Sequence, residues 1–162
     1  MRLALPLVLL LSACQLSSPP DDQMNFAAAV ANPAIPLHPN ETPELRTLIN
    51  KYAEVYDLPR TLLHRVIIRE STHNPAARNG PYYGLMQILP ATARGMGFKG
   101  QPADLLDAET NLKYAGKYLR GAWLLSDGDE ATAVKWYARG YYYEARDRCM
   151  LVATGLADRE RC

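Results

Sequence analysis

Glu70 is the residue whose type and position most clearly suggest chemistry in this sequence. On a helix that turns about 100° per residue, Val66, Ile67 and Glu70 all lie within about 60° of Leu63, on one apolar side. A carboxyl group among apolar neighbours has its charged form disfavoured, so its pKa rises. Such a group can protonate a leaving oxygen near neutral pH. The pattern therefore predicts a general acid at Glu70, with Arg69 about 100° away around the helix and facing elsewhere.

No second carboxylate follows Glu70 at close range. Residues 71–103 contain neither Asp nor Glu. Most glycosidases use a pair of carboxyl groups, and the nearest later candidates, Asp104, Asp107 and Glu109, fit a loop and a capped helix start better. The alternative for Glu70 is a solvated residue just past the last packed turn of its helix.

The elements that would position Glu70 are helices, because apolar residues recur at i, i+3 and i+4 while period-2 alternation is nearly absent. Asp57 is expected to cap the helix that bears Glu70, with Pro59 in its first turn. An Asn-, Gly- and Pro-rich loop is expected over residues 74–83. The predicted fold class is all-α, with helices over residues 44–56, 59–70, 111–125 and 130–139 and a further helix that opens at Pro90.

The N-terminus reads as a targeting segment. Arg2 precedes an apolar run that is far shorter than the roughly 20 residues needed to span a bilayer, so residues 1–13 are predicted to be a signal peptide. Residues 11–14, Leu-Ser-Ala-Cys, resemble the bacterial lipobox, which implies a lipid-modified Cys14. Because Gln15 rather than Asp follows, we expect the periplasmic face of the outer membrane. The alternative is an ordinary cleaved signal with a chance cysteine.

Beyond the signal, composition divides the 162 residues into a tether, a domain and a tail. Residues 14–43 are rich in Pro and Ser and predict an extended tether. The catalytic domain is expected over residues 44–146, and a C-terminal tail over residues 147–162. Apart from Cys14 the chain has two cysteines, Cys149 and Cys162, which we expect to form a disulfide in an oxidising compartment. The alternative is two free thiols.

The net charge of +1 is too small to produce a positive electrostatic field that would attract nucleic acid, so no such partner is expected. We expect a monomer that meets the membrane only through its lipid anchor. His38, His64 and His73 lack ligand-like spacing along the chain, and core or surface roles are expected for all three. Neither a metal nor an organic cofactor is predicted.

Four motifs in order resemble the soluble lytic transglycosylases of bacteria and their goose-type lysozyme relatives. They cover roughly residues 45–146. Where the family has Tyr-Asn-Ala-Gly, this chain has Ala138 in place of Asn. The motifs are Glu70-Ser71 with Asn74-Pro75, Gly84-Leu85-Met86-Gln87-Ile88 with Pro90 and Thr92-Ala93, Leu106-Asp107 with Asn111 and then Gly116-Lys117-Tyr118-Leu119, and the segment from Ala133 to Gly140.

The resemblance implies a lysozyme-like domain that acts on peptidoglycan glycan strands without a cofactor. It implies that Glu70 protonates the glycosidic oxygen between N-acetylmuramic acid and N-acetylglucosamine, and then deprotonates the C6 hydroxyl that closes a 1,6-anhydro ring. The alternatives are a muramidase, which adds water, and a peptidoglycan-binding lipoprotein without turnover, which Ala138 would permit.

The resemblance also implies substrate-binding roles for Ser71, Tyr83, Met86, Gln87 and Tyr137. Ser71 is expected to hold the Glu70 rotamer. Gln87 would bind sugar hydroxyls or N-acetyl groups, and the phenol of Tyr137 would reach Glu70 or the sugar. Met86 either lines the sugar trough or belongs to the core, and Tyr83, with its neighbour Tyr82, either stacks on a sugar or packs the loop.

Overall fold

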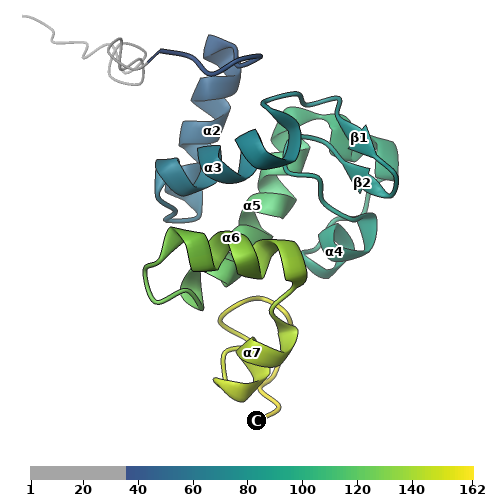
Figure 1. The fold of residues 1–162 in the computed structure, drawn as a ribbon. Helices are drawn as coiled ribbons and strands as arrows, with labels where there is room; N and C mark the ends of the chain where they lie inside the picture. The colour runs from purple at the N-terminus through teal and green to yellow at the C-terminus, as the bar shows by residue number, and fades with distance from the viewer. Residues whose placement is uncertain (1–35) are drawn as a thin grey trace, which may run out of the picture.

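The computed structural model describes residues 36–162, so the predicted signal peptide, Cys14 and most of the expected tether lie outside the described residues. The described part is mostly helical, with one small hairpin, and the all-α prediction is confirmed (Figure 1). The elements are α2 (Pro43–Val55), α3 (Arg60–Ser71), β1 (Arg78–Asn79), β2 (Tyr82–Tyr83), α4 (Pro90–Gly95), the 3-10 helix η1 (Pro102–Leu106), α5 (Ala108–Leu124), α6 (Glu130–Arg139) and α7 (Tyr142–Asp147).

Helix α5 is the central element of the domain. Asp107 caps it, since its Oδ1 accepts from the backbone N–H of Thr110 at 2.8 Å. The face formed by Leu112, Ala115 and Leu119 is fully buried. Because α2, α4, α6 and η1 all pack against it, α5 sets the relative positions of the elements that surround the site (Figure 1).

Helices α2 and α3 form the next layer, and their junction differs from the sequence prediction. The Thr42 hydroxyl caps α2 by accepting from Leu45 N at 3.1 Å. Asp57, expected as the cap of α3, has φ 47° and belongs to the turn that ends α2. An N-cap residue is normally extended, so Pro59 takes that position instead and α3 begins at Arg60.

The segment predicted as a loop between α3 and α4 contains a two-stranded antiparallel hairpin. Arg78 pairs with Tyr83, and Asn79 pairs with Tyr82. Gly80 has φ 56° in the tight turn, a conformation that glycine adopts without steric cost. The hairpin determines the directions in which the Tyr82 and Tyr83 side chains point.

The C-terminal segment is folded, and Tyr141 at its start packs against α5. Tyr141 approaches α5 so closely that a Cβ at Gly121 would lie 2.3 Å from its hydroxyl oxygen, which donates to the Tyr118 carbonyl at 2.7 Å. Beyond α7, Leu151 is fully buried, and Cys149 is joined to Cys162 by a disulfide. Residues 147–162 therefore form a loop that the disulfide closes and that buried Leu151 and Thr154 anchor, whereas residues 158–162 are exposed.

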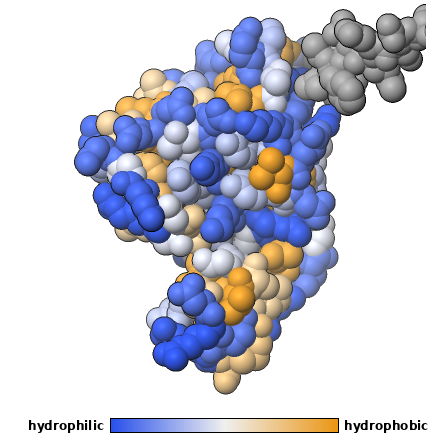
Figure 2. Space-filling view, turned by 180° about the vertical axis from the view of Figure 1, so that it is seen from behind, coloured by the Kyte–Doolittle hydropathy of each residue, from blue (hydrophilic) through white to orange (hydrophobic). Residues whose placement is uncertain are grey.

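The surface is mainly hydrophilic on the face shown in Figure 2, and its hydrophobic residues form small separate patches. The C-terminal segment projects from the main body in the same view. Within residues 36–162, no helix combines the length and apolar character needed to cross a bilayer.

Candidate active site

Glu70 lies in the last turn of α3, on the same side as its buried residues. Leu63, Val66 and Ile67 are at most 1% exposed, whereas the Glu70 side chain is 23% exposed. The helix stops directly afterwards because Thr72 has φ 51° and its N–H closes the last turn on the carbonyls of Ile67 and Ile68. The carboxyl group is therefore held at a helix end, where it is partly buried and partly exposed to solvent.

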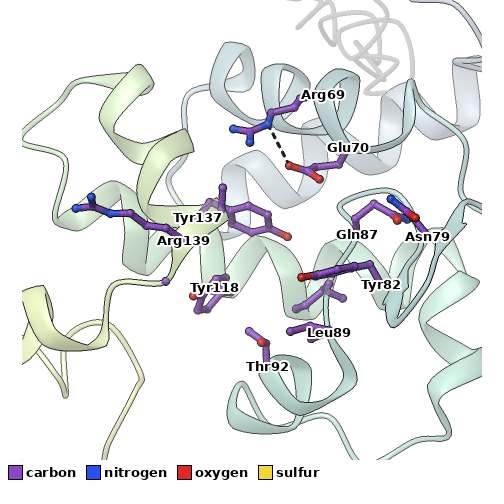
Figure 3. A pocket seen from close by; sticks show the side chains of 13 residues that line it. Arg69, Glu70, Asn79, Tyr82, Gln87, Leu89, Thr92, Tyr118, Tyr137 and Arg139 are labelled. Atoms are coloured by element: carbon purple, nitrogen blue, oxygen red, sulfur yellow. Dashed lines mark ion pairs between the residues drawn. The ribbon is translucent and has the colours of Figure 1, made fainter.

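Two opposing influences act on the Glu70 carboxyl. Burial raises its pKa above the usual value of 4.5, and the nearby positive charge of Arg69 counteracts that rise. The Arg69 Nε lies 3.5 Å from Glu70 Oε1 (Figure 3). The expectation that Arg69 faces elsewhere was wrong, because its long side chain reaches back around the helix. Burial has the larger effect, so the pKa of Glu70 is raised.

An open pocket of about 620 Å³ lies in front of Glu70. Side chains from α3, the hairpin, the start of α4, and helices α5 and α6 surround it (Figure 3). Among the lining residues, which all belong to the described part of the chain, Glu70 has the only carboxyl group. The lining consists of Arg69, Glu70, Asn79, Tyr82, Gln87, Ile88, Leu89, Thr92, Tyr118, Tyr137, Ala138, Arg139 and Gly140.

Tyr137 and Tyr118 form the aromatic wall of the pocket. Their rings meet edge to face at a centroid distance of 5.5 Å. The Tyr137 hydroxyl donates to the Met86 carbonyl at 2.8 Å, so it fixes the loop beneath Glu70 rather than donating to Glu70. Burial, followed by the nearby charge of Glu70, raises the pKa of Tyr137 well above its usual range, so the phenol stays neutral.

Gln87 is also part of the pocket, with 9% of its surface exposed and φ 47°. Its amide nitrogen donates to the carbonyls of Ala77 and Gly84, at 3.1 and 2.8 Å. Both amide hydrogens are therefore used within the protein, and the side-chain oxygen is the group that can accept a hydrogen bond from a ligand.

Ser71 does not have the expected partner. Its hydroxyl donates to the Leu85 carbonyl at 2.7 Å, with a longer contact to Ile67 O at 3.3 Å, and not to Glu70. Ser71 is also absent from the pocket lining. The hydroxyl instead joins the end of α3 to the loop that carries Gln87.

Two other expected binding residues lie away from the pocket. Met86 is fully buried and belongs to the core. Its backbone N–H donates to Asn111 and its carbonyl accepts from the Tyr137 hydroxyl, and these two hydrogen bonds hold its loop against the core. Tyr83 packs against the core, with the Arg78 guanidinium 4.7 Å from its ring centre. Its neighbour Tyr82, 42% exposed, takes the place on the pocket wall. Alternation along β2 explains this, since successive side chains point to opposite faces.

Asn111 belongs to the motif that begins at Leu106-Asp107, but no role was predicted for it from the sequence. In the structure it positions the loop between β2 and α4. Fully buried on α5, it accepts from Met86 N at 3.0 Å and donates to the carbonyls of Tyr83 and Leu105, both at 2.8 Å. Gly84 has φ 75°, and a Cβ there would lie 2.2 Å from the Asn111 amide nitrogen. The glycine is required for this close approach, and the amide holds the loop that presents Gln87.

The end of α6 closes the pocket beside Tyr137. Ala138 and Arg139 line it, and the Arg139 guanidinium lies 3.9 Å from the centre of the Trp136 ring. Ala138 brings no polar group to the wall. Tyr118 and Arg139 had no predicted role, and only the Gly-Lys-Tyr-Leu motif could have indicated Tyr118.

The three histidines do not line this pocket. They converge elsewhere, together with Glu41, although they are far apart in the sequence. The expectation from spacing was therefore a poor guide to their arrangement.

The domain is helical, and its pocket contains a single carboxylic acid, which is partly buried at a helix end. Tyrosine and amide side chains line the rest of the pocket. These features are those of a lysozyme-like protein. Residues 47–147 match the family model described as Transglycosylase SLT domain. This match covers more than half of the chain, and the chain belongs to that family. The search of solved structures found no match.

Proposed function

We propose that this protein is a peptidoglycan lytic transglycosylase that cleaves the β-1,4 bond between N-acetylmuramic acid and N-acetylglucosamine. The observation that carries the proposal is a single carboxylic acid, Glu70, with a raised pKa in an open pocket of a Transglycosylase SLT domain. One carboxyl group is sufficient when the same group acts first as acid and then as base.

In the first step, protonated Glu70 gives its proton to the glycosidic oxygen. The bond from that oxygen to C1 of N-acetylmuramic acid breaks, and the sugar's own N-acetyl group stabilises the positive charge at C1. The ionised Glu70 then removes the proton of the C6 hydroxyl, whose oxygen attacks C1. Glu70 regains its proton and the product carries a 1,6-anhydro ring, without consumption of water.

The other pocket residues support this reaction by position and shape. Gln87 can accept from a sugar hydroxyl or N-acetyl N–H, since its two donors are already used. Tyr82 is placed to stack on a sugar face, and Tyr118 and Tyr137 form the wall opposite. Ser71 and Asn111 act indirectly, by holding the loop that bears Gln87.

A non-catalytic peptidoglycan-binding protein is the second candidate, because Ala138 takes the place of the family's Asn on the pocket wall. Glu70→Gln separates the two. We expect wild-type protein to release soluble muropeptides from purified peptidoglycan and Glu70→Gln to release none while still co-sedimenting with the polymer. Release that is equally low in both would favour the binder, and equal turnover in both would remove Glu70 from the mechanism.

We also propose that Cys14 is the lipid-modified first residue of the mature protein, anchored at the periplasmic face of the outer membrane. The motif at residues 11–14 and Gln15 support this. Cys14→Ser should move the protein from the membrane fraction to the soluble fraction. An unchanged membrane fraction would contradict the anchor without affecting the catalytic proposal.

A further inference from the structure

All three histidines of the chain meet in one place, and none of them lines the pocket. His38 precedes α2, His64 lies within α3 and His73 follows its end. The His38 and His73 rings are stacked at 4.9 Å, and the His64 ring lies 4.9 and 5.3 Å from them. Glu41, 7% exposed, completes the cluster.

One potential ligand atom from each of these four residues lies within 4.8 Å of the other three. His64 Nδ1 is 3.1 Å from His73 Nε2 and 3.9 Å from Glu41 Oε1. Tetrahedral zinc with bonds of about 2.1 Å places its ligand atoms about 3.4 Å apart, so shifts of about 1 Å would complete the sphere. Three imidazoles and one carboxylate are a donor set that suits zinc or a similar divalent transition metal.

Hydrogen bonds from Arg46 and from the His38 backbone fix the orientation of the Glu41 carboxylate. Arg46 donates to both oxygens of Glu41, at 2.5 and 2.6 Å, and the His38 N–H donates to Oε2 at 2.8 Å. Ligating carboxylates are commonly oriented by such outer hydrogen bonds. Glu41 Oε1 accepts only one of these three bonds, so it keeps an acceptor position on the side of His64.

The His64 and His73 imidazoles are partners in the protein, since His64 Nδ1 and His73 Nε2 lie within hydrogen-bond distance, and an ion between them would replace this contact. His73 is fully buried, and its Nδ1 has no hydrogen-bond partner among residues 36–162. A buried polar atom without a partner is unfavourable.

We propose that His38, Glu41, His64 and His73 form a binding site for one divalent transition metal ion, best matched by Zn²⁺. The ion would join the segment before α2 to the end of α3, where Asn40 already donates to the Thr72 carbonyl at 3.0 Å. Figure 1 shows these two segments at the same end of the molecule. His73 is three residues after Glu70, so the site would brace the helix end that holds the candidate acid. This inference does not depend on the proposed enzymatic activity.

The test uses the full chain with Cys14→Ser, without a polyhistidine tag and with the disulfide intact, so that no thiol competes. Zn²⁺ binding is measured by competition with a chromophoric chelator, and Mg²⁺ serves as the hard-cation control. We expect one Zn²⁺ per chain, an increase in the thermal midpoint with Zn²⁺, and neither effect with Mg²⁺. Failure of this protein to bind Zn²⁺ in the micromolar range would overturn the proposal.

Variants locate the site. His38→Ala, in a partly exposed position, and His64→Asn should each weaken Zn²⁺ binding by at least about 100-fold, because loss of an outer-shell partner alone costs about 10–100-fold. Glu41→Gln should weaken it too. Glu109→Gln is the matched control, since it also removes a carboxylate from an ion pair, with Lys51 at 2.5 Å, and it should bind as wild type does. Unchanged affinity in the cluster variants would overturn the assignment.

A measurement on the Cys14→Ser chain, with no change in the cluster, covers the case of a misfolded variant. Nitrogen-15 spectra of the imidazoles report all three histidines separately. One equivalent of Zn²⁺ should shift the ring signals of all three together. Ring signals that remain in place while Zn²⁺ is bound would assign the ion to another part of the surface and contradict the site.

Discussion

The ionisation of Glu70 is controlled by its place at the end of α3. Burial disfavours the carboxylate, and Arg69 Nε at 3.5 Å favours it. The proposed mechanism needs the protonated form in the free enzyme. Turnover should therefore decrease as the pH rises through the raised pKa of Glu70.

Arg69→Ala tests this balance directly. Without the guanidinium the pKa of Glu70 should rise further, so the alkaline limb of the kcat/KM profile should move to higher pH. Arg69→Lys, which keeps the charge, should show a smaller shift. An alkaline limb that moves to lower pH in Arg69→Ala would contradict the assignment of that limb to Glu70.

Glu70→Gln makes a prediction about stability as well as about activity. Because the folded-state pKa lies above the usual 4.5, the protonated carboxyl contributes stability that is present below pH 4.5 and is lost as pH rises through the raised pKa. The thermal midpoint of Glu70→Gln, relative to wild type, should therefore increase from acidic to neutral pH. A difference that decreases over that range would show that Glu70 is stabilised as the carboxylate.

At the scale of elements, the site depends on how α5 holds the loop between β2 and α4. The Asn111 side chain makes three hydrogen bonds to backbone groups of Met86, Tyr83 and Leu105. Asn111→Ala should lower the free energy of unfolding by about 3 kcal/mol, with about 1 kcal/mol for each bond. Denaturant titration measures the loss.

Asn79→Ala is the control, since Asn79 is an exposed residue of the hairpin. Its stability should stay within about 0.5 kcal/mol of wild type. Equal stability of the two variants would mean that the Asn111 amide does not support the loop.

The sequence predicted the helices well because their apolar periodicity is strong. The helix that ends at Arg139 before Gly140 and the Asp107 cap match the structure. The cap at Asp57 failed because that residue closes the preceding turn with a positive φ. The hairpin was missed because its strands are only two residues long and give no alternation to detect.

The residues that line the pocket could be predicted where they lie on a helical face. They could not be predicted where the conformation of a loop determines the direction of the side chain. Glu70 and Tyr137 line the pocket at the positions that helical periodicity and motif matching indicate. Met86 and Tyr83 do not, because backbone hydrogen bonds and the pleat of β2 turn them toward the core. The histidine cluster joins residues from three separate segments, so no spacing along the chain could reveal it.

At the scale of the whole molecule, the C-terminal segment closes the domain opposite the N-terminal end. The disulfide of Cys149 and Cys162, 13 residues apart, constrains the unfolded chain. Replacing both cysteines by Ser should lower the free energy of unfolding by about 3 kcal/mol, according to the entropy of a loop of this length.

Cys14→Ser serves as the control for this prediction, because it removes a sulfur without opening the loop. It should leave the denaturant midpoint unchanged. If the double variant were as stable as that control, the disulfide would contribute nothing to the closure of the C-terminal segment.

The central claim is that Glu70 alone closes an anhydro ring on the cleaved sugar. The most direct measurement is mass spectrometry of muropeptides released in ¹⁸O-labelled water by the wild-type enzyme and by Glu70→Gln. We expect wild-type products with 1,6-anhydro ends and no ¹⁸O, and no products from Glu70→Gln. Reducing ends that carry ¹⁸O, or equal release by the variant, would contradict it.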